Sequence, residues 1–383
     1  MDTLPPEIVD IVLTQTDGAT RPLLRHVSHQ WRTLVDARRR VCRRHVGLVL
    51  TTCLDHHACH VASHRRWSVF WWLLDNVTLS IPDVDAAVSS KVAGEGDVQL
   101  LARFRDRGLC CQTHDSAFFG ALYGHLDIVK WARASGCAWH NSFCWAAANG
   151  GHLELLKWLR DNGCPWNAST CSEAAGGGHF DVVRWARTHG CDWDEWVCTH
   201  AARKNDMEAL QWARINGCPW NKHACAHAAL NGNMEMLQWA RASGCPWDES
   251  TCERAAQGGH LTILQQIRAS GCPWDARTGD RAAERGDLEM MRWLQEEGCP
   301  WSERACSAAA RKGHLHVLQW LREQGCPWNR WTCDEAAQEG HMEVLQWAIA
   351  NGCPWDVMTI DRARNHGHSD IVLWLRSQRR HKV

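Results

Sequence analysis

Apolar positions along most of this chain recur with the spacing of short helices, and glycines separate one group from the next. One such group consists of Leu153, Leu155, Leu156, Trp158 and Leu159. Together these side chains form a face that is too wide for a helix covered on one side only. We therefore expect the helix to pack against neighbours on more than one side.

One segment illustrates the elements that the pattern predicts. We expect Asn167 to cap a short first helix over 170–175, because Asn favours the position just before a helix. Three consecutive glycines, 176–178, break that helix, and a second helix follows over 179–188. Gly190 stands where a left-handed residue ends the second helix. The segment is predicted to be a helical hairpin.

The hairpin recurs at a constant interval along the chain, and the register never slips. Gly-Cys pairs begin at 136, 163, 190, 217, 244, 271, 298, 325 and 352. A Trp follows each pair, at 139, 166, 193, 220, 247, 274, 301, 328 and 355. The turn between the two helices carries Gly at 96, 124, 151, 178, 232, 259, 286, 313, 340 and 367, and Asn at 205. A fixed period of this length is typical of a solenoid, in which each unit packs only on its neighbours.

We predict an all-α protein with about eleven stacked hairpins over residues 81–376. Residues 1–44 stand apart from the repeat as a separate unit, and we expect 45–80 to form a junction or a degenerate capping repeat. A short basic tail, 377–383, ends the chain. The repeats make an extended surface, and such surfaces bind other molecules.

Composition narrows the class of protein. The formal net charge is −1, so the chain lacks the electrostatic footprint of a nucleic-acid-binding protein. No segment is apolar for long enough to cross a bilayer, and the first residues lack the basic and then apolar order of a signal peptide. We expect an intracellular protein of the cytoplasm or nucleus, with no membrane partner.

The repeating unit resembles the ankyrin repeat. Residues 174–183, Ala-Ala-Gly-Gly-Gly-His-Phe-Asp-Val-Val, are similar to that family's Ala-Ala-x-x-Gly-His-x-x-Val-Val core, and 163–167 are similar to its loop. The family's unit is longer than the unit of this chain. The missing residues fall between Asn167 and the next helix, where the family places a projecting β-hairpin finger. The resemblance therefore implies a fingerless array whose first helices line a concave side.

Residues 4–34 resemble an F-box, with Leu-Pro-Pro-Glu-Ile at 4–8 and Val-Ser-His-Gln-Trp at 27–31. By that resemblance a three-helix unit docks on a Skp-type adaptor and, through it, on a cullin. The residues that would carry docking, or the packing beneath it, are Leu4, Pro5, Ile8, Leu24, Val27 and Trp31. The alternative is an N-terminal helical cap, because a solenoid needs an end unit with a polar face.

Metal binding and catalysis have weaker sequence support. Cys53, His56, His57, Cys59, His60 and His64 are all residue types that bind zinc, but their spacing matches no standard pair. The alternative is a His-rich junction. The repeated cysteines occupy small or apolar positions, where free Cys packs as a small hydrophobe. Asp and Asn replace His in the repeated His column, which indicates a turn and helix-start role. We expect no enzyme activity, no cofactor and no bound metal.

Partner binding is expected where the repeat stops repeating. Two positions of the first helix vary without a shared structural demand, and aromatic and Arg residues dominate interface energetics. The candidates are Trp145, Trp196, His223, Arg277, Arg304 and Trp331. Apolar packing explains the repeated Trp columns, which we predict to lie in the core.

The sequence thus predicts a substrate-recruiting adaptor of a cullin-type ubiquitin ligase, in which the solenoid holds an unidentified target protein. An F-box before many ankyrin-like repeats also resembles proteins of large DNA viruses, where the complex would form in the host cell. The alternative is an ankyrin-type protein-binding scaffold without ubiquitin chemistry.

Overall fold

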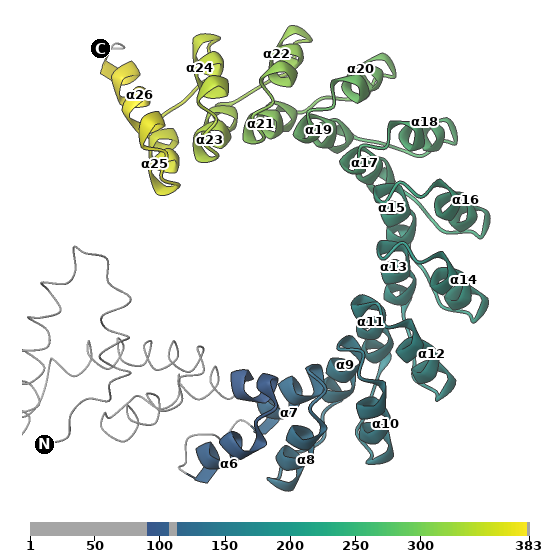
Figure 1. Cartoon of the computed structure of the whole chain (residues 1–383). Coiled ribbons are helices and arrows are strands. Elements are labelled where there is room, and N and C mark those ends of the chain that lie inside the picture. The colour runs from purple at the N-terminus through teal and green to yellow at the C-terminus, as the bar shows by residue number, and fades with distance from the viewer. Residues whose placement is uncertain (1–89, 107–112, 381–383) are drawn as a thin grey trace, which may run out of the picture. The chain divides into compact units, whose positions relative to one another are not determined.

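The computed structural model describes residues 90–106 and 113–380 (Figure 1). The predicted F-box-like unit and its six docking residues lie outside these ranges, and so do the junction and the Cys/His stretch 53–64. The chain forms two compact units, residues 1–166 and residues 167–383.

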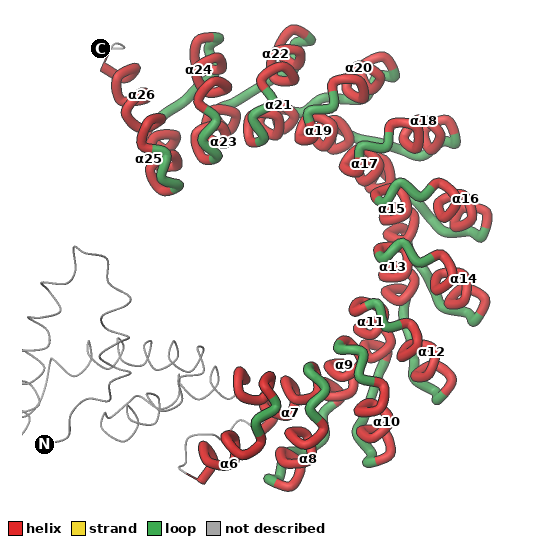
Figure 2. The backbone as a smooth tube through the Cα atoms, in the orientation of Figure 1, coloured by secondary structure: helices red, strands yellow, loops and turns green. Residues whose placement is uncertain are grey.

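The described residues are helical throughout, with short turns and loops and no strand among them (Figure 2). In the first unit, residues 90–95 are followed by α6 Val98–Asp106, α7 Thr113–Leu122, α8 Leu126–Ala134, α9 Asn141–Asn149 and α10 Leu153–Asp161. The second unit begins with α11 Ala168–Gly177, α12 Phe180–Thr188, α13 Glu195–Arg203, α14 Met207–Ile215, α15 Lys222–Leu230 and α16 Met234–Ala242. It continues with α17 Glu249–Gly258, α18 Leu261–Ala269, α19 Ala276–Arg285, α20 Leu288–Glu296 and α21 Glu303–Arg311. The last helices are α22 Leu315–Glu323, α23 Arg330–Gln338, α24 Met342–Ala350, α25 Val357–Asn365 and α26 Ser369–Arg380.

The predicted turns are confirmed. All eleven turn positions have positive φ, including Asn205 at 59°, and so do all nine glycines of the Gly-Cys pairs. One boundary was wrong: α11 runs through Gly176 and Gly177, and only Gly178, with φ 92°, ends it. The buried Ala174 and Ala175 hold this last turn against the neighbouring helices, so a helix that includes two glycines persists.

Small side chains set the packing of the first helices. The odd-numbered helices from α9 to α23 each carry a buried Ala pair, such as Ala201-Ala202 in α13 and Ala228-Ala229 in α15. Alanine lets two helix backbones approach closely. The second helices contribute larger buried side chains, such as Leu210 and Leu237. The core is therefore a continuous layer inside each unit.

No helix of the described residues is long and apolar enough to cross a membrane.

A cysteine thiol closes each hairpin. In eight loops the Cys Sγ lies 3.3–3.7 Å from a backbone carbonyl 24 residues earlier, and that carbonyl belongs to the cap residue of the first helix. The eight cysteines are Cys164, Cys191, Cys218, Cys245, Cys272, Cys299, Cys326 and Cys353. All sixteen described cysteines are free, and all are buried. The predicted packing role is confirmed, and the thiol also joins the start of each hairpin to its end.

The Arg at the end of the second helix holds the same loop. Arg187 Nη1 donates to the Cys191 carbonyl at 3.1 Å, and its guanidinium lies 4.7 Å from the centre of the Trp193 ring. Arg241 repeats the arrangement with the Cys245 carbonyl and with Trp247, at 4.0 Å. A cation at this place also suits the helix dipole. The structure assigns the Arg column a more specific role, as a clamp on the loop.

The prediction that the Trp columns lie in the core was wrong. Trp193 and Trp212 are only half-buried, and their rings meet edge to face with centres 5.7 Å apart. The Trp220 and Trp239 rings form the same pair at 5.8 Å. Trp193 and Trp220 therefore each have an Arg on one side and a second-helix Trp on another. A flat ring with two such partners remains partly exposed because the short repeating unit has no finger to cover it.

We predict that Arg241→Lys lowers the free energy of unfolding by about 1–2 kcal/mol, because Lys loses the planar stack on Trp247 and the bond to the Cys245 carbonyl. The matched control is Arg292→Lys, at an exposed position on α20. Thermal denaturation followed by circular dichroism measures both variants. Equal midpoints for the two would contradict the clamp.

Candidate functional site

The candidate site is the inner side of the second unit. In Figure 1 the odd-numbered helices of this unit lie along the inner side of an arc, and the even-numbered helices stand outside it. Four positions of each of these helices share one face at helical spacing, away from buried residues such as Val197 and Ala201 of α13. In α13 they are Trp196, Thr199, His200 and Arg203, which follow one another at helical spacing. The corresponding positions of α15–α25 follow at the interval of the repeat. We call these four positions on each of the five helices α13, α15, α17, α19 and α21 the inner strip.

Two of the predicted partner-binding residues come together at the start of the inner strip. Trp196 is 45% exposed, and its ring stacks on His223 with centres 6.0 Å apart and planes 11° apart. The ring of His200 lies 6.0 Å from Trp196 as well. Together with His227, one turn after His223, these residues make the ring cluster. It offers a flat aromatic surface with three imidazoles.

The imidazoles of the ring cluster lie in cationic surroundings. Burial, together with the charges of Arg254 and Arg203 and the other two imidazoles, lowers the pKa of His227 to about 4. Burial and Arg203 also lower the pKa of His200, against the opposing effect of Asp194. The Nδ1 atoms of His200 and His227 are buried without a hydrogen-bond partner among the described residues. Both imidazoles are therefore neutral at physiological pH.

Arg277 belongs to a ladder of arginines and carboxylates in the middle of the inner strip. Glu253 is buried and pairs with Arg277 at 3.1 Å and with Arg281 at 3.0 Å. Arg281 also pairs with Glu284 at 2.9 Å, and Glu284 pairs with Arg311 at 3.2 Å. The ladder joins α17, α19 and α21 through charges that are partly shielded from water.

Arg304 stands at the end of the inner strip and is exposed. Its charge acts on the carboxylate of Asp280, which accepts a hydrogen bond from Ser302 Oγ at 2.8 Å. Burial raises the pKa of Asp280, and the charge of Arg304 opposes that rise. Arg304 forms no ion pair among the described residues, which leaves its guanidinium available to a partner.

Trp331 lies beyond the inner strip, on α23, and is 43% exposed. The Arg362 guanidinium lies 4.8 Å from the centre of its ring, and Arg362 Nε lies 3.6 Å from the buried Asp334 carboxylate. Asp334 also accepts a hydrogen bond from Thr359 Oγ1 at 2.6 Å. Met358 of α25, at 52% exposure, extends this second apolar patch.

Trp145 belongs to the first unit, and the other candidates belong to the second. It is half-buried, and its ring packs at an angle of 65° on Phe118, with centres 5.0 Å apart. Among the candidates of the second unit, the rings of Trp196 and His223 stack on each other, whereas Trp331 has other partners.

Sequence reasoning missed two further positions of the first helix. In the repeat of Trp196 they lie four and seven residues after that residue, and each other repeat has equivalent positions. They hold His200, His227, Arg254, Arg281 and Arg203, among others, and they form most of the contacts just described. The signal was present, because these positions also vary from repeat to repeat. It was overlooked because the variable positions were sought only at the start of the helix.

The described contacts of the cysteines and the repeated histidines are structural. Burial raises the pKa of the Cys299 thiol to about 12, which keeps that thiol neutral and a poor nucleophile. His152 and His341 donate from Nε2 to carbonyls of the preceding hairpin at 3.1 and 3.0 Å. Asp206, in the same column, instead caps its own helix through the Ala209 N–H. No group of three metal-binding side chains occurs in the described part of the chain.

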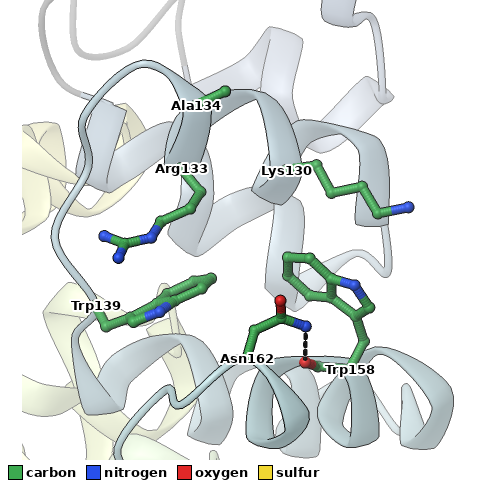
Figure 3. Close-up of a pocket in the computed structure, with 6 residues that line it drawn as sticks. All are labelled: Lys130, Arg133, Ala134, Trp139, Trp158 and Asn162. Carbon is green, nitrogen blue, oxygen red and sulfur yellow. Dashed lines mark hydrogen bonds between the residues drawn. The ribbon is translucent and has the colours of Figure 1, made fainter.

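An open groove of about 390 Å³ lies in the first unit (Figure 3). It is lined by Lys130, Arg133, Ala134, Trp139, Trp158 and Asn162. Arg133 lies 4.7 Å from the Trp139 ring centre, and the Trp139 and Trp158 rings meet at an angle of 74°. These are the same loop clamps that occur in other repeats, so the groove follows from the architecture.

Comparison with protein families supports the resemblance of the repeats. A family model of ankyrin repeats in many copies matches residues 143–187 and 305–349. Ankyrin repeats are therefore detected in both units. They imply a protein-binding scaffold, and the families that share them are typically not enzymes.

Comparison with solved structures finds other helical repeat proteins. The pentatricopeptide repeat protein PPR10 in complex with an 18-nucleotide psaJ RNA element matches with a TM-score of 0.44 and 13% identity, over 91% of this chain and 63% of that one. PPR10 from maize matches with a TM-score of 0.40 and 13% identity, over 98% and 64%. This chain spans less than two thirds of those chains. Comparison with curated proteins gives no significant match.

We predict that acid destabilises this part of the molecule through His227. Its pKa in the folded chain is about 4, below the unfolded value of about 6.5, so below pH 6.5 the unfolded chain binds a proton that the folded chain does not. Stability should fall as the pH drops from 7 toward 4. His227→Gln should reduce that fall, as measured by thermal denaturation at a series of pH values.

The control for this experiment is His316→Gln, which removes an exposed imidazole. If the dependence of the denaturation midpoint on pH is the same in wild type and in His227→Gln, the neutral state of His227 in the folded chain is wrong.

Proposed function

We propose that this protein is a scaffold that binds a target protein on the inner side of its second unit. One observation carries the proposal: the side chains of the inner positions change from repeat to repeat, over a framework whose loops, turns and core do not. The Gly-Cys pairs, by contrast, keep the same two residues in all nine copies. Freedom to vary, combined with exposed aromatic and Arg side chains, favours recognition.

Two apolar anchors support this proposal. Trp196 and Trp331 are among the largest exposed apolar side chains of the described residues, and each lies beside cationic or aromatic neighbours. Large amphipathic rings of this kind contribute strongly to binding because they bury much area with few rotatable bonds.

A finer proposal concerns the target's fate. The resemblance of residues 4–34 to an F-box favours an adaptor that links the bound target to a Skp-type protein and a cullin, inside a eukaryotic cell. The support for this step is the sequence alone, in particular Leu4, Pro5 and Trp31. A plain binding scaffold is the alternative, because it needs only the solenoid.

The binding surface is tested by Trp196→Ala combined with Trp331→Ala. We expect the double variant to remain folded and to lose the proteins that the wild-type chain recovers from eukaryotic lysate, because both anchors are removed. The matched control is Ile215→Ala with Leu373→Ala, which removes two exposed apolar side chains from even-numbered helices. Recovery of the same proteins at the same level by both double variants would contradict this surface.

The adaptor role is tested by Leu4→Ala combined with Pro5→Ala. We expect this variant to lose the Skp-type protein and the cullin from the recovered set, while it keeps the target proteins, because docking and target binding lie in different parts of the chain. Quantitative mass spectrometry of the captured proteins measures both. If neither the wild-type chain nor the variant recovers a Skp-type protein, the adaptor role is wrong and the scaffold remains.

A further inference from the structure

The inner strip carries an excess of positive charge. It holds six arginines against three carboxylates, Glu253, Asp280 and Glu284. The arginines are Arg203, Arg254, Arg277, Arg281, Arg304 and Arg311. This local excess contrasts with the net charge of the whole chain, which is −1.

The two signs also differ in depth. The Glu253 side chain is 11% exposed, whereas that of its partner Arg277 is 48% exposed. Glu284 is 24% exposed, and its partner Arg311 is 41% exposed. Glu253 and Glu284 are therefore more deeply buried than the guanidinium groups with which they pair, whereas Asp275, which also pairs with Arg277, at 2.9 Å, is 40% exposed. An approaching molecule meets the guanidinium groups of Arg277 and Arg311 before it meets Glu253 and Glu284.

Three of these arginines are not neutralised. Arg203, Arg254 and Arg304 have no carboxylate within ion-pair distance among the described residues. Arg203 donates to the Gly176 carbonyl at 3.1 Å, and Arg254 donates to Gln257 Oε1 at 2.8 Å. Both partners are neutral groups. The positive charges of these side chains thus remain available to a ligand.

The ring cluster lies among these charges. Arg203 follows Trp196 and His200 on α13, and Arg254 on α17 acts electrostatically on His227 of α15. The inward positions of α13 and α15 carry no carboxylate. An aromatic surface beside two cations favours a ligand that pairs an apolar or aromatic side chain with nearby carboxylates.

We propose that the inner strip binds an extended acidic segment of a partner protein, with an aromatic side chain of that segment on the ring cluster. This inference rests on the proposed scaffold function and names the chemistry of the target. Neighbouring helices pack roughly 8–10 Å apart, so five inner helices span roughly 32–40 Å. An extended chain covers that length with about 12 residues.

Nucleic acid fits the strip less well than an acidic peptide. A polyphosphate carries a charge at every unit and meets the carboxylates of α17 and α19 wherever it lies. A peptide places its carboxylates opposite Arg203, Arg254 and Arg304 and keeps neutral residues opposite the carboxylates of the strip.

The test uses the full chain and fluorescein-labelled peptides of about 12 residues, in which glutamates alternate with glycines around a central Phe. A second peptide has Gln in place of every Glu. Fluorescence anisotropy should show binding of the acidic peptide and about tenfold weaker binding of the Gln peptide, since the Gln peptide loses its charge pairs with the arginines. Higher salt should weaken only the acidic peptide.

Matched variants locate the site. Arg254→Gln combined with Arg304→Gln should weaken the acidic peptide about tenfold, and Trp196→Ala should weaken both peptides. The control, Arg292→Gln combined with Arg376→Gln, removes the same charge from exposed positions on α20 and α26 and should leave binding unchanged. Circular dichroism checks that each variant is folded. If the double variant is not folded, Arg304→Gln alone replaces it in the test, because Arg304 is exposed.

Three outcomes would overturn the proposal: equal binding of the two peptides, equal weakening by the inner and outer Arg variants, or tighter binding of a single-stranded RNA of similar length through the same arginines. Each is distinguishable from failure of the scaffold function. If the acidic peptide does not bind while the Trp196 and Trp331 double variant still loses its captured proteins, the scaffold stands and only the acidic class is wrong.

Discussion

The rest of the second unit depends on the contacts within the loop that follows each second helix. A left-handed Gly turns the chain, the Cys carbonyl accepts a bond from Arg, the Cys thiol reaches the cap of the first helix, and Trp lies against the same Arg. These contacts satisfy backbone groups that a helix end would otherwise leave without partners. So short a hairpin cannot bury its own apolar faces, and it is ordered only when such loops hold it against its neighbours.

The clamp also accounts for the position of the tryptophans. In an ankyrin unit with a finger, additional backbone would cover the loop. Here, in the repeat of Trp220, Arg214 stacks on the half-buried Trp220 ring and Trp239 meets that ring edge to face. Histidine adds a further link between hairpins by donating to a carbonyl of the preceding one, and where Asp or Asn replaces it, the side chain caps its own helix instead. The same column thus has two structural roles, and neither role requires a catalytic or metal-binding side chain.

Because the loops and the core fix the framework, the inner positions are free to differ. That freedom produces distinct neighbourhoods on one unit: aromatic and imidazole rings at α13 and α15, an Arg and carboxylate ladder at α17 to α21, and Trp331 with Arg362 and Asp334 at α23 and α25. The charge that this surface presents to solvent depends on how deeply each charged side chain is buried. Glu253 and Glu284 are buried more deeply than the arginines that pair with them, so these arginines present positive charge to solvent, although the chain as a whole is almost neutral.

The sequence by itself determined the repeat, the helical hairpin and every left-handed turn, because Gly-Cys and Gly or Asn at fixed intervals leave the backbone few alternatives. It also located Trp196, His223, Arg277, Arg304 and Trp331 as variable positions, although His200, His227 and Arg254 escaped notice. Only the tertiary structure decided which of these residues meet, since Trp196 and His223 belong to successive repeats and touch only when two hairpins stack. It also decided the exposure of the tryptophans and the role of the Arg column, because burial and ring stacking depend on neighbours that local sequence does not specify.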